Sequence, residues 1–438
     1  MAIDRREFLT GAAVVAGTAL IGAAGCSTDK QETTGKQKIK LAPGTIQKIS
    51  EVTKPLAITM IDYSWMLKHH RYGAYEDYDK FFSELVERGY NAVRMDCFPH
   101  LVAADENGKI QETFIHKKEG RGRLLWGNDF SIRSKPRKSL IEFLSKCREY
   151  GVHAGLATWF IHHGTDRSKI FRSVDDFVRA WDETLTFVKD NGLMDVVTYV
   201  DVLNEYPLAH GLSWLDEQID KRGDVKLFKA NNPDANIPPE GSFETEGWFN
   251  DLQVVYYQSF MRDSINKLKA KWPELDIFAS ETGMPVPQDY VNFDAIDKHF
   301  WFIHSKDLAE KTGFRRMTRN KPSDISFHDT YYKGLKHWDE NKNRYGLWME
   351  GRIKMLADLG QKYAVPVGNT EGWGAVFWED NPTIDWRFIR EAAEIAVPLA
   401  VKHGYKFICT SNFTCPQFVG MWEDISWHQH LTKMIKLG

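Results

Sequence analysis

The chain has 438 residues, with 57 Lys and Arg against 60 Asp and Glu, so its formal net charge is only −3. This near-neutral balance gives no electrostatic case for binding nucleic acid. Four cysteines follow Cys26, at positions 97, 147, 409 and 415. Their spacing matches no zinc-binding pattern, so we expect buried thiols.

Residues 1–26 have the features of an export signal rather than of a folded domain. The segment from Asp4 to Thr10, with its Arg5-Arg6 pair, resembles a twin-arginine signal, and the general secretory route is the alternative. The apolar stretch that follows is too short for a standard transmembrane helix. The sequence from Ala23 to Cys26 resembles a bacterial lipobox. We therefore expect an exported protein, lipid-anchored through Cys26 to the bacterial cell envelope on its periplasmic or surface side.

Residues 27–54 are polar and rich in Lys, Gln and Thr, which is typical of a flexible tether. Residues 55–438 alternate short apolar runs with amphipathic stretches, the pattern of repeated βα units. The expected strands are Leu56–Ile61, Ala92–Met95, His153–Thr158, Val196–Leu203, Asp276–Ser280, Ala295–Phe302, Val365–Thr370 and Phe407–Thr410. The expected helices are Tyr75–Arg88, Pro136–Tyr150, Ser173–Asn191, Asp251–Lys271, Tyr345–Tyr363, Ile384–His403 and Ile425–Lys436. Together they predict an α/β fold, a (β/α)₈ TIM barrel.

Three long insertions follow the second, fourth and sixth predicted strands, at Pro99–Ser134, Tyr206–Asn250 and Lys306–Arg344. In a barrel, the loops that follow strands gather at one face. Loops of this length are uncommon unless they have a function. We expect them to form the walls of a substrate cleft.

Two glutamates stand at the ends of predicted strands. Glu205 follows Val196–Leu203, and Glu371 follows Val365–Thr370. Barrel enzymes carry catalytic groups at the C-terminal ends of their strands, so both side chains are expected at one face. Two carboxylates held across a sugar ring are the minimal apparatus for cleaving a glycosidic bond. The alternative is that both are ordinary polar residues at strand ends.

The segment from Lys54 to Gly438 resembles clan A glycoside hydrolases, most of all the cellulase-like branch around glycoside hydrolase family 5. The motif Asn204-Glu205 ends the fourth strand, where the clan keeps its acid/base, and Glu371 ends the seventh, where it keeps its nucleophile. Arg94 lies on the second strand, where family 5 places an arginine that supports the nucleophile. The resemblance implies these roles for the three residues, and a hydrogen bond from Asn204 to the sugar 2-hydroxyl is expected.

The run from Asp297 to Trp301 on the sixth strand resembles the His-x-Tyr element of the same family, with His299 as the histidine and Trp301 in place of the tyrosine. The family's tyrosine hydroxyl hydrogen-bonds the nucleophile, and an indole can only donate from a different position. Another group, with Tyr331 and Tyr332 as candidates, is then expected in that role.

Further polar and aromatic side chains follow predicted strands and are candidates for sugar contacts: His162, His163, Glu281, Trp378 and Asn412. One of the two histidines is expected to contact substrate or a carboxylate, and the alternative is a loop histidine without a role. Trp378 is either a stacking platform or a core residue. Glu281 is a third carboxylate at the predicted active face.

The sequence thus predicts a retaining glycoside hydrolase that acts on a poly- or oligosaccharide by double displacement, without metal or cofactor. Its expected partners are a carbohydrate and, through the lipid anchor only, a membrane. One alternative is a metal-dependent sugar isomerase or epimerase that uses Glu205, Glu281, His299 and Glu371 as ligands. The other is a non-catalytic carbohydrate-binding lipoprotein on a hydrolase scaffold.

Overall fold

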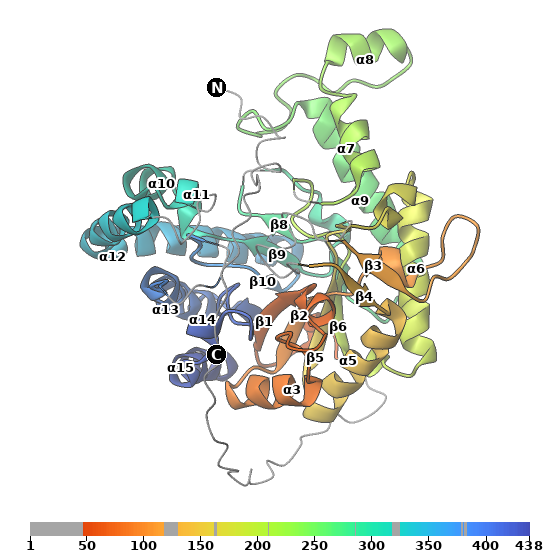
Figure 1. The fold of residues 1–438 in the computed structure, drawn as a ribbon. Coiled ribbons are helices and arrows are strands. Elements are labelled where there is room, and N and C mark those ends of the chain that lie inside the picture. The colour runs from red at the N-terminus through yellow and green to blue at the C-terminus, as the bar shows by residue number, and fades with distance from the viewer. Residues whose placement is uncertain are drawn as a thin grey trace.

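The structure is a computed structural model that describes residues 47–117, 130–161, 164–208, 210–284, 286–317, 325–377, 380 and 383–438. Its centre is a parallel sheet that curls on itself (Figure 1). The strands of this sheet are β1 (Leu56–Asp62), β2 (Ala92–Asp96), β5 (His153–Ala157), β6 (Val197–Asp201), β7 (Ile277–Phe278), β8 (Glu281–Thr282), β9 (Ile296–His299), β10 (Val367–Asn369) and β11 (Phe407–Cys409). Each of these strands is buried along its whole length, as expected of a parallel sheet covered by helices.

The segment from Ile277 to Thr282 closes the sheet into a barrel. Its first half, β7, pairs with β6 through Val200 and Ile277, while its second half, β8, pairs with β9 through Glu281 and Lys298. The linear strand order therefore runs from β7 through β6, β5, β2, β1, β11, β10 and β9 to β8. Because β7 and β8 are consecutive parts of one segment, the α/β barrel predicted from the sequence is confirmed.

Helices lie outside the barrel, between successive strands (Figure 1). The long ones are α3 (Tyr78–Glu87), α5 (Pro136–Tyr150), α6 (Val174–Asp190), α9 (Asp251–Lys271), α12 (Ile325–Tyr363), α13 (Arg387–Lys402) and α15 (Ile425–Leu437). Side chains cap several of them: Ser173 accepts a hydrogen bond at the start of α6, and Asn250 forms a capping box with Gln253 on α9. Both α5 and α9 have the predicted bounds.

Aromatic rings from three strands fill the barrel interior. Tyr199 on β6 packs against Phe278 and Phe407, with ring centroids 5.2 and 5.7 Å away. Two glycines make room for these rings. A Cβ at Gly155 would lie 1.9 Å from the Tyr199 ring, and a Cβ at Gly368 would lie 2.2 Å from the Phe407 ring. The interior is thus a packed core, which supports the strand ends from inside.

The predicted insertion Lys306–Arg344 is largely helical, which corrects the prediction. It holds α10 (Lys306–Thr312), α11 (Phe314–Met317) and the first half of α12. Buried residues recur along α12 at helical spacing, at Phe327, Tyr331, Leu335, Trp338, Tyr345, Met349, Ile353 and Leu356. The same stripe lies on both sides of Tyr345, where the predicted helix began. Its apolar face therefore spans the whole element, and the 39 residues form one helix.

The other two insertions also carry short elements. The loop after β2 holds α4 (Pro99–Val102) and the antiparallel pair β3 (Phe114–His116) and β4 (Ile132–Ser134). The loop after β6 holds α7 (Ser213–Asp220) and α8 (Val225–Asn231), and α8 projects away from the barrel at the top of Figure 1. Further short helices include α2 (Ser64–Leu67) after β1, α14 (Val419–Trp422) after β11, and the 3₁₀ helix η4 (Tyr290–Asn292) before β9.

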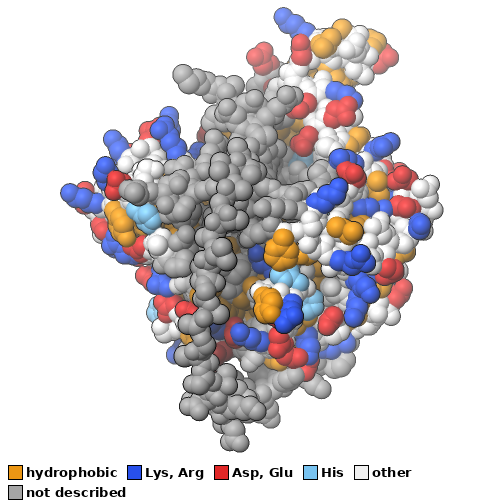
Figure 2. All heavy atoms as spheres, in the orientation of Figure 1, with side chains coloured by type: hydrophobic (Ala, Val, Ile, Leu, Met, Phe, Trp, Pro, Cys, Tyr) orange, Lys and Arg blue, Asp and Glu red, His pale blue; other side chains and the backbone are white. Residues whose placement is uncertain are grey.

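The described surface carries interspersed acidic and basic side chains on the face shown in Figure 2, in keeping with the small net charge. Cys97, Cys147, Cys409 and Cys415 are free, buried thiols, as expected. Within the described ranges, no helix combines the length and apolar character needed to cross a bilayer. Residues 1–46, with Cys26 and most of the predicted tether, lie outside the described residues.

Candidate active site

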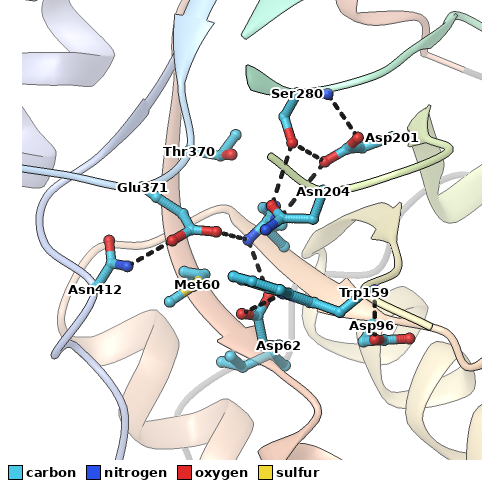
Figure 3. Close-up of polar contacts among 12 residues, drawn as sticks. Met60, Asp62, Asp96, Trp159, Asp201, Asn204, Ser280, Thr370, Glu371 and Asn412 are labelled. Atoms are coloured by element: carbon cyan, nitrogen blue, oxygen red, sulfur yellow. Dashed lines mark hydrogen bonds and ion pairs between the residues drawn. The ribbon is translucent and has the colours of Figure 1, made fainter. Parts of the chain in front are cut away.

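Arg94 is the centre of a buried polar network at the C-terminal ends of the strands. Its Nη1 lies 2.9 Å from Oδ1 of Asp62 and 2.8 Å from Oε1 of Glu371. Its Nη2 donates to Oδ1 of Asn204 and lies 3.5 Å from Oδ2 of Asp201. Figure 3 shows these acceptors converging from different strands. One guanidinium thus serves three carboxylates, and Arg presents the fork of donors that such a site needs.

Glu371 follows β10 and is held through both of its carboxylate oxygens. Arg94 donates to Oε1, and the Asn412 amide Nδ2 donates to Oε2 across 2.9 Å (Figure 3). The Asn412 Oδ1 accepts the backbone N–H of Gly372 at 2.8 Å, which fixes the amide so that its nitrogen faces the carboxylate. Asn412, predicted as a sugar-binding residue, is therefore a partner of Glu371.

The pKa of Glu371 is raised to about 7. Burial is the largest cause, because it penalises the charged carboxylate, and the neighbouring negative charges of Glu205 and Asp62 add to it. The positive charges of His299 and Arg94 oppose the shift without cancelling it. Glu371 is consequently a carboxylate that ionises close to neutral pH.

Glu205 follows β6 and faces Glu371 across His299. His299 Nδ1 lies 3.1 Å from Oε1 of Glu205 and 3.6 Å from Oε1 of Glu371. One oxygen of each glutamate and a ring nitrogen of the histidine all lie within 4.8 Å of one another. The Glu205 side chain keeps 13% of its surface exposed and has a positive φ of 50°, while its N–H donates to Ser280 Oγ at 3.2 Å.

His299 is fully buried and lies between acids on both sides. Its Nε2 lies 3.3 Å from Thr370 Oγ1 and 3.7 Å from Oδ2 of Asp297. Burial alone would lower the pKa of this imidazole, but the charges of Glu371 and Asp297 and the hydrogen bonds to Asp297 and Glu205 raise it well above its usual value. The ring is therefore expected to carry a positive charge at neutral pH.

The two polar side-chain atoms of Asn204 differ in their hydrogen bonds. Its Oδ1 accepts from Arg94 and from Ser280 Oγ, while its Nδ2 is buried and meets no acceptor in the described part of the chain. A buried donor without a partner is costly unless a ligand satisfies it. The amide nitrogen is thus available as a donor, and its contact with a sugar hydroxyl stays a prediction.

Several residues of the site were not singled out from the sequence: Asp62, Trp159, Asp201, Ser280, Asp297 and Thr370. The Trp159 indole N–H donates to Oδ2 of Asp62 at 3.0 Å, and the partly exposed ring lies beside the network (Figure 3). The three aspartates belong to strands β1, β6 and β9, where a charged residue inside a buried apolar run is expensive. An aspartate within a predicted strand was therefore the signal that could have identified these residues, because a buried charge needs a partner.

Three other predicted residues make the following contacts. The Glu281 carboxylate pairs with Lys298 at 3.1 Å, and because Lys298 and His299 are successive residues of β9 they point to opposite faces of the sheet. Trp301 is buried and forms a bridge with Trp373. The Tyr331 hydroxyl donates its hydrogen to the carbonyl oxygen of Asp385, so it does not donate to Glu371.

Tyr332 is 54% exposed on α12. The predicted residues His162, His163 and Trp378 lie outside the described residues.

A metal centre of the kind considered above would need Glu205, Glu281, His299 and Glu371 together. Of these, Glu281 lies on the other face of the sheet, paired with Lys298. The remaining three have possible ligand atoms within 4.8 Å of one another, but the charge of one of them, Glu371, is already balanced by Arg94. A guanidinium bonded to the same carboxylate repels a cation, so the donor set does not favour a metal.

An α/β barrel with two facing glutamates at strand ends has the architecture of a glycoside hydrolase. The chain belongs to the sugar-binding cellulase-like family, whose model matches residues 58–436. Among curated proteins, none matches the sequence significantly.

The chain is also similar to solved structures. The chain is 25% identical to a protein of Parabacteroides distasonis described provisionally as a glycoside hydrolase, with a TM-score of 0.68 over 87% of this chain and 94% of that chain. A trimodular family 5 endo-β-1,4-glucanase of Bacillus licheniformis is 10% identical, with a TM-score of 0.45 over 89% of this chain and 61% of that chain. An exo-β-1,4-mannosidase of an Opitutaceae bacterium is 9% identical, with a TM-score of 0.46 over 91% and 62%. The last two similarities are too low to support an argument about activity.

Proposed function

We propose that the protein is a retaining glycoside hydrolase that cleaves a poly- or oligosaccharide by double displacement. Glu371 attacks the anomeric carbon and forms a glycosyl-enzyme. Glu205 protonates the leaving oxygen and then takes a proton from the water that releases the sugar. Arg94 and Asn412 orient Glu371, and no metal takes part.

The observation that carries this proposal is the closeness of the two carboxylates, which have oxygens within 4.8 Å of one another. Retaining enzymes hold their carboxyl groups about 5–5.5 Å apart, whereas inverting enzymes need about 6.5–9.5 Å to place a water between them. An approach of one oxygen from each carboxylate to within 4.8 Å is nearer the retaining spacing than the inverting one, so it supports attack by Glu371 itself.

The surroundings of the pair suit a sugar. Asn204 Nδ2, which meets no acceptor among the described residues, offers a donor to a hydroxyl, a contact that strengthens in the transition state. The Trp159 ring is partly exposed and fixed by Asp62, and a rigid aromatic face is suited to stack on the C–H face of a sugar ring. These two features support a carbohydrate as the ligand of the site.

The experiment is a survey of β-linked glucans, mannans and xylans and of host glycans, with release of reducing ends as the readout. Wild type should release sugar from at least one of them, and Glu371→Gln should release none while keeping its circular dichroism spectrum. Glu394→Gln is a matched control, because this glutamate lies on α13 and only accepts a hydrogen bond from Trp427. Binding of a glycan without any turnover by wild type would instead favour a sugar-binding lipoprotein.

Glu205 is tested by substrates that differ in their leaving groups. Glu205→Ala should lose most of its rate on glycosides with poor leaving groups, by roughly 10²–10⁴-fold, because these need a proton from the acid. Aryl glycosides with good leaving groups should be affected much less in the bond-breaking step. An equal loss on both kinds of substrate would argue against the acid role.

We further propose that the protein is exported and anchored to the cell envelope by a lipid on Cys26, with residues 27–54 as the tether. The twin-arginine-like segment and the lipobox-like sequence support this location. Labelled palmitate should enter the protein in cells and be lost in Cys26→Ser. Equal labelling of both forms, or a soluble cytoplasmic pool only, would contradict the anchor.

A further inference from the structure

Behind the two glutamates, three buried residues at the ends of β9 and β10 contact one another. Asp297 and His299 are two positions apart on β9, so their side chains share one face of the strand. Thr370 follows β10 beside them. All three are completely buried, so every hydrogen of this group needs an acceptor inside the protein.

The direction of the hydrogen bonds starts from Asp297. Its Oδ1 accepts the backbone N–H of Thr370 at 3.0 Å, and its Oδ2 accepts the Thr370 hydroxyl. Burial alone would raise the pKa of Asp297, but the charge of His299 and the hydrogen bonds from His299 and Thr370 hold it below its usual value. An ionised carboxylate can only accept, so the single hydrogen of the Thr370 hydroxyl is committed to Asp297.

The same hydroxyl oxygen lies 3.3 Å from Nε2 of His299. Because its hydrogen points to Asp297, Thr370 Oγ1 can only accept from the ring, and Nε2 must therefore carry a hydrogen. The negative charge of Asp297, 3.7 Å from Nε2, favours the same arrangement. The other ring nitrogen, Nδ1, lies 3.1 Å from Oε1 of Glu205.

We propose that Asp297 and Thr370 are positioning residues that keep a hydrogen on Nε2 of His299, so that the ring exchanges protons only through Nδ1, with Glu205. A neutral ring then presents a bare Nδ1 to a protonated Glu205, and a charged ring presents Nδ1–H to an ionised Glu205. In both states one proton lies between the two groups. The hydrogen-bond direction does not depend on the proposed function, but the use of that proton does.

In the proposed reaction this proton has a defined path. The glycosidic C–O bond breaks, its electron pair stays on the leaving oxygen, and that oxygen takes the proton from Glu205 as Glu371 bonds to the anomeric carbon. Water then gives a proton back to Glu205, its oxygen bonds to the anomeric carbon, and Glu371 leaves as a carboxylate. Throughout both steps Nε2 keeps its hydrogen, so His299 does not transfer a proton through Nε2 toward Thr370 or Asp297.

The charged groups around His299 all act on the same ring. Glu205 and Glu371 face Nδ1, and Asp297 faces Nε2. Arg94 acts through Glu371, while Asp62 and His304 contribute at longer range. Thr370 is the neutral member of the group, so replacing it tests the hydrogen bond without changing the charge.

The test is ¹⁵N and ¹H NMR of the full protein labelled at histidine, with the His299 signals assigned from a His299→Gln sample. Wild type should show a hydrogen-bonded Nε2–H proton at every pH, and any deprotonation of the ring should appear at Nδ1 alone. A bare Nε2 at any pH, or no such proton signal, would overturn the proposal. This readout needs no substrate and therefore stands apart from a failure of the proposed hydrolase function.

Two variants extend the test, Thr370→Val and Asp297→Asn. Each should shift or abolish the Nε2–H signal, while the matched control Thr198→Val, a buried strand threonine bonded to Ala154, should leave it unchanged. Folded variants whose Nε2–H signal matches wild type would also overturn the proposal. With an active glycoside in hand, both variants should lose roughly tenfold in rate on poor leaving groups and less on good ones, as expected for impaired acid catalysis.

Discussion

Arg94 and Glu371 form a buried ion pair, in which Nη1 and Oε1 lie 2.8 Å apart and the two side chains are 0% and 5% exposed. The residues come from β2 and from the end of β10, which are not neighbours in the sheet, so the contact crosses the barrel. The same guanidinium also binds Asp62 and approaches Asp201. This arginine therefore contributes to the position and the charge of Glu371, together with Asn412 and His299.

Removing that guanidinium should destabilise the protein. Arg94→Met leaves the carboxylates of Asp62, Asp201 and Glu371 buried without their common cation, which we expect to cost about 3–5 kcal/mol of unfolding free energy. Urea denaturation at neutral pH measures this loss. The double variant Arg94→Met, Asp62→Asn should recover part of it. A midpoint equal to that of wild type in the single variant would contradict the account.

The activity should fall on the acid side of neutrality. Attack requires ionised Glu371, whose pKa is raised to about 7, so kcat/KM should drop about tenfold for each pH unit below that value. The measurement is a pH profile of kcat/KM on an active substrate. An acid limb near the ordinary glutamate pKa of 4.5 would contradict the electrostatic description of the site.

The same shift predicts a stability effect with a definite sign. The folded-state pKa of Glu371 is above its unfolded value, so folding favours the protonated form, and stability from this group is lost as the pH rises from 4.5 through about 7. Glu371→Gln removes the buried negative charge. At pH 8 the free energy of unfolding of the variant should therefore exceed that of wild type by about 1–3 kcal/mol, and its melting temperature should be a few degrees higher. At pH 5 the two melting temperatures should be close. A lower melting temperature of the variant at pH 8 would reverse the sign.

Asn412 should matter through both atoms of its amide. Asn412→Ala removes the donor to Glu371 and the acceptor of the Gly372 N–H, and we expect at least a tenfold loss of kcat. Asn412→Asp keeps the acceptor but places a second negative charge beside Glu371, so its acid limb should move to higher pH. Profiles of the two variants that overlay that of wild type would contradict this role.

The sequence was sufficient for the barrel because its signals are local. Each strand is a short apolar run, and the cap Ser173 marks a helix start. The first half of α12 was missed because its stripe of buried aromatic residues is interspersed with charged ones. There the contacts with the rest of the fold decided the structure, and they are not visible in a local pattern.

The site was predictable where a residue stands at a strand end, as Glu205, Asn204 and Glu371 do. It was less predictable where geometry across the barrel decides. Glu281 also ends a predicted strand, yet the pairing of β8 with β9 turns its side chain to the face of Lys298. Asn412 could be predicted near the site, but its role as the partner of Glu371 depends on a contact between residues 41 positions apart.

In the proposed mechanism, Glu371 forms a covalent bond to the sugar. The most direct test is ¹H NMR of the product at the start of hydrolysis of an active glycan, before the anomers equilibrate. The first product should have the same anomeric configuration as the substrate, because two displacements restore it. An initial product of inverted configuration would show that water attacks directly, and it would contradict the assignment of Glu371 as the nucleophile.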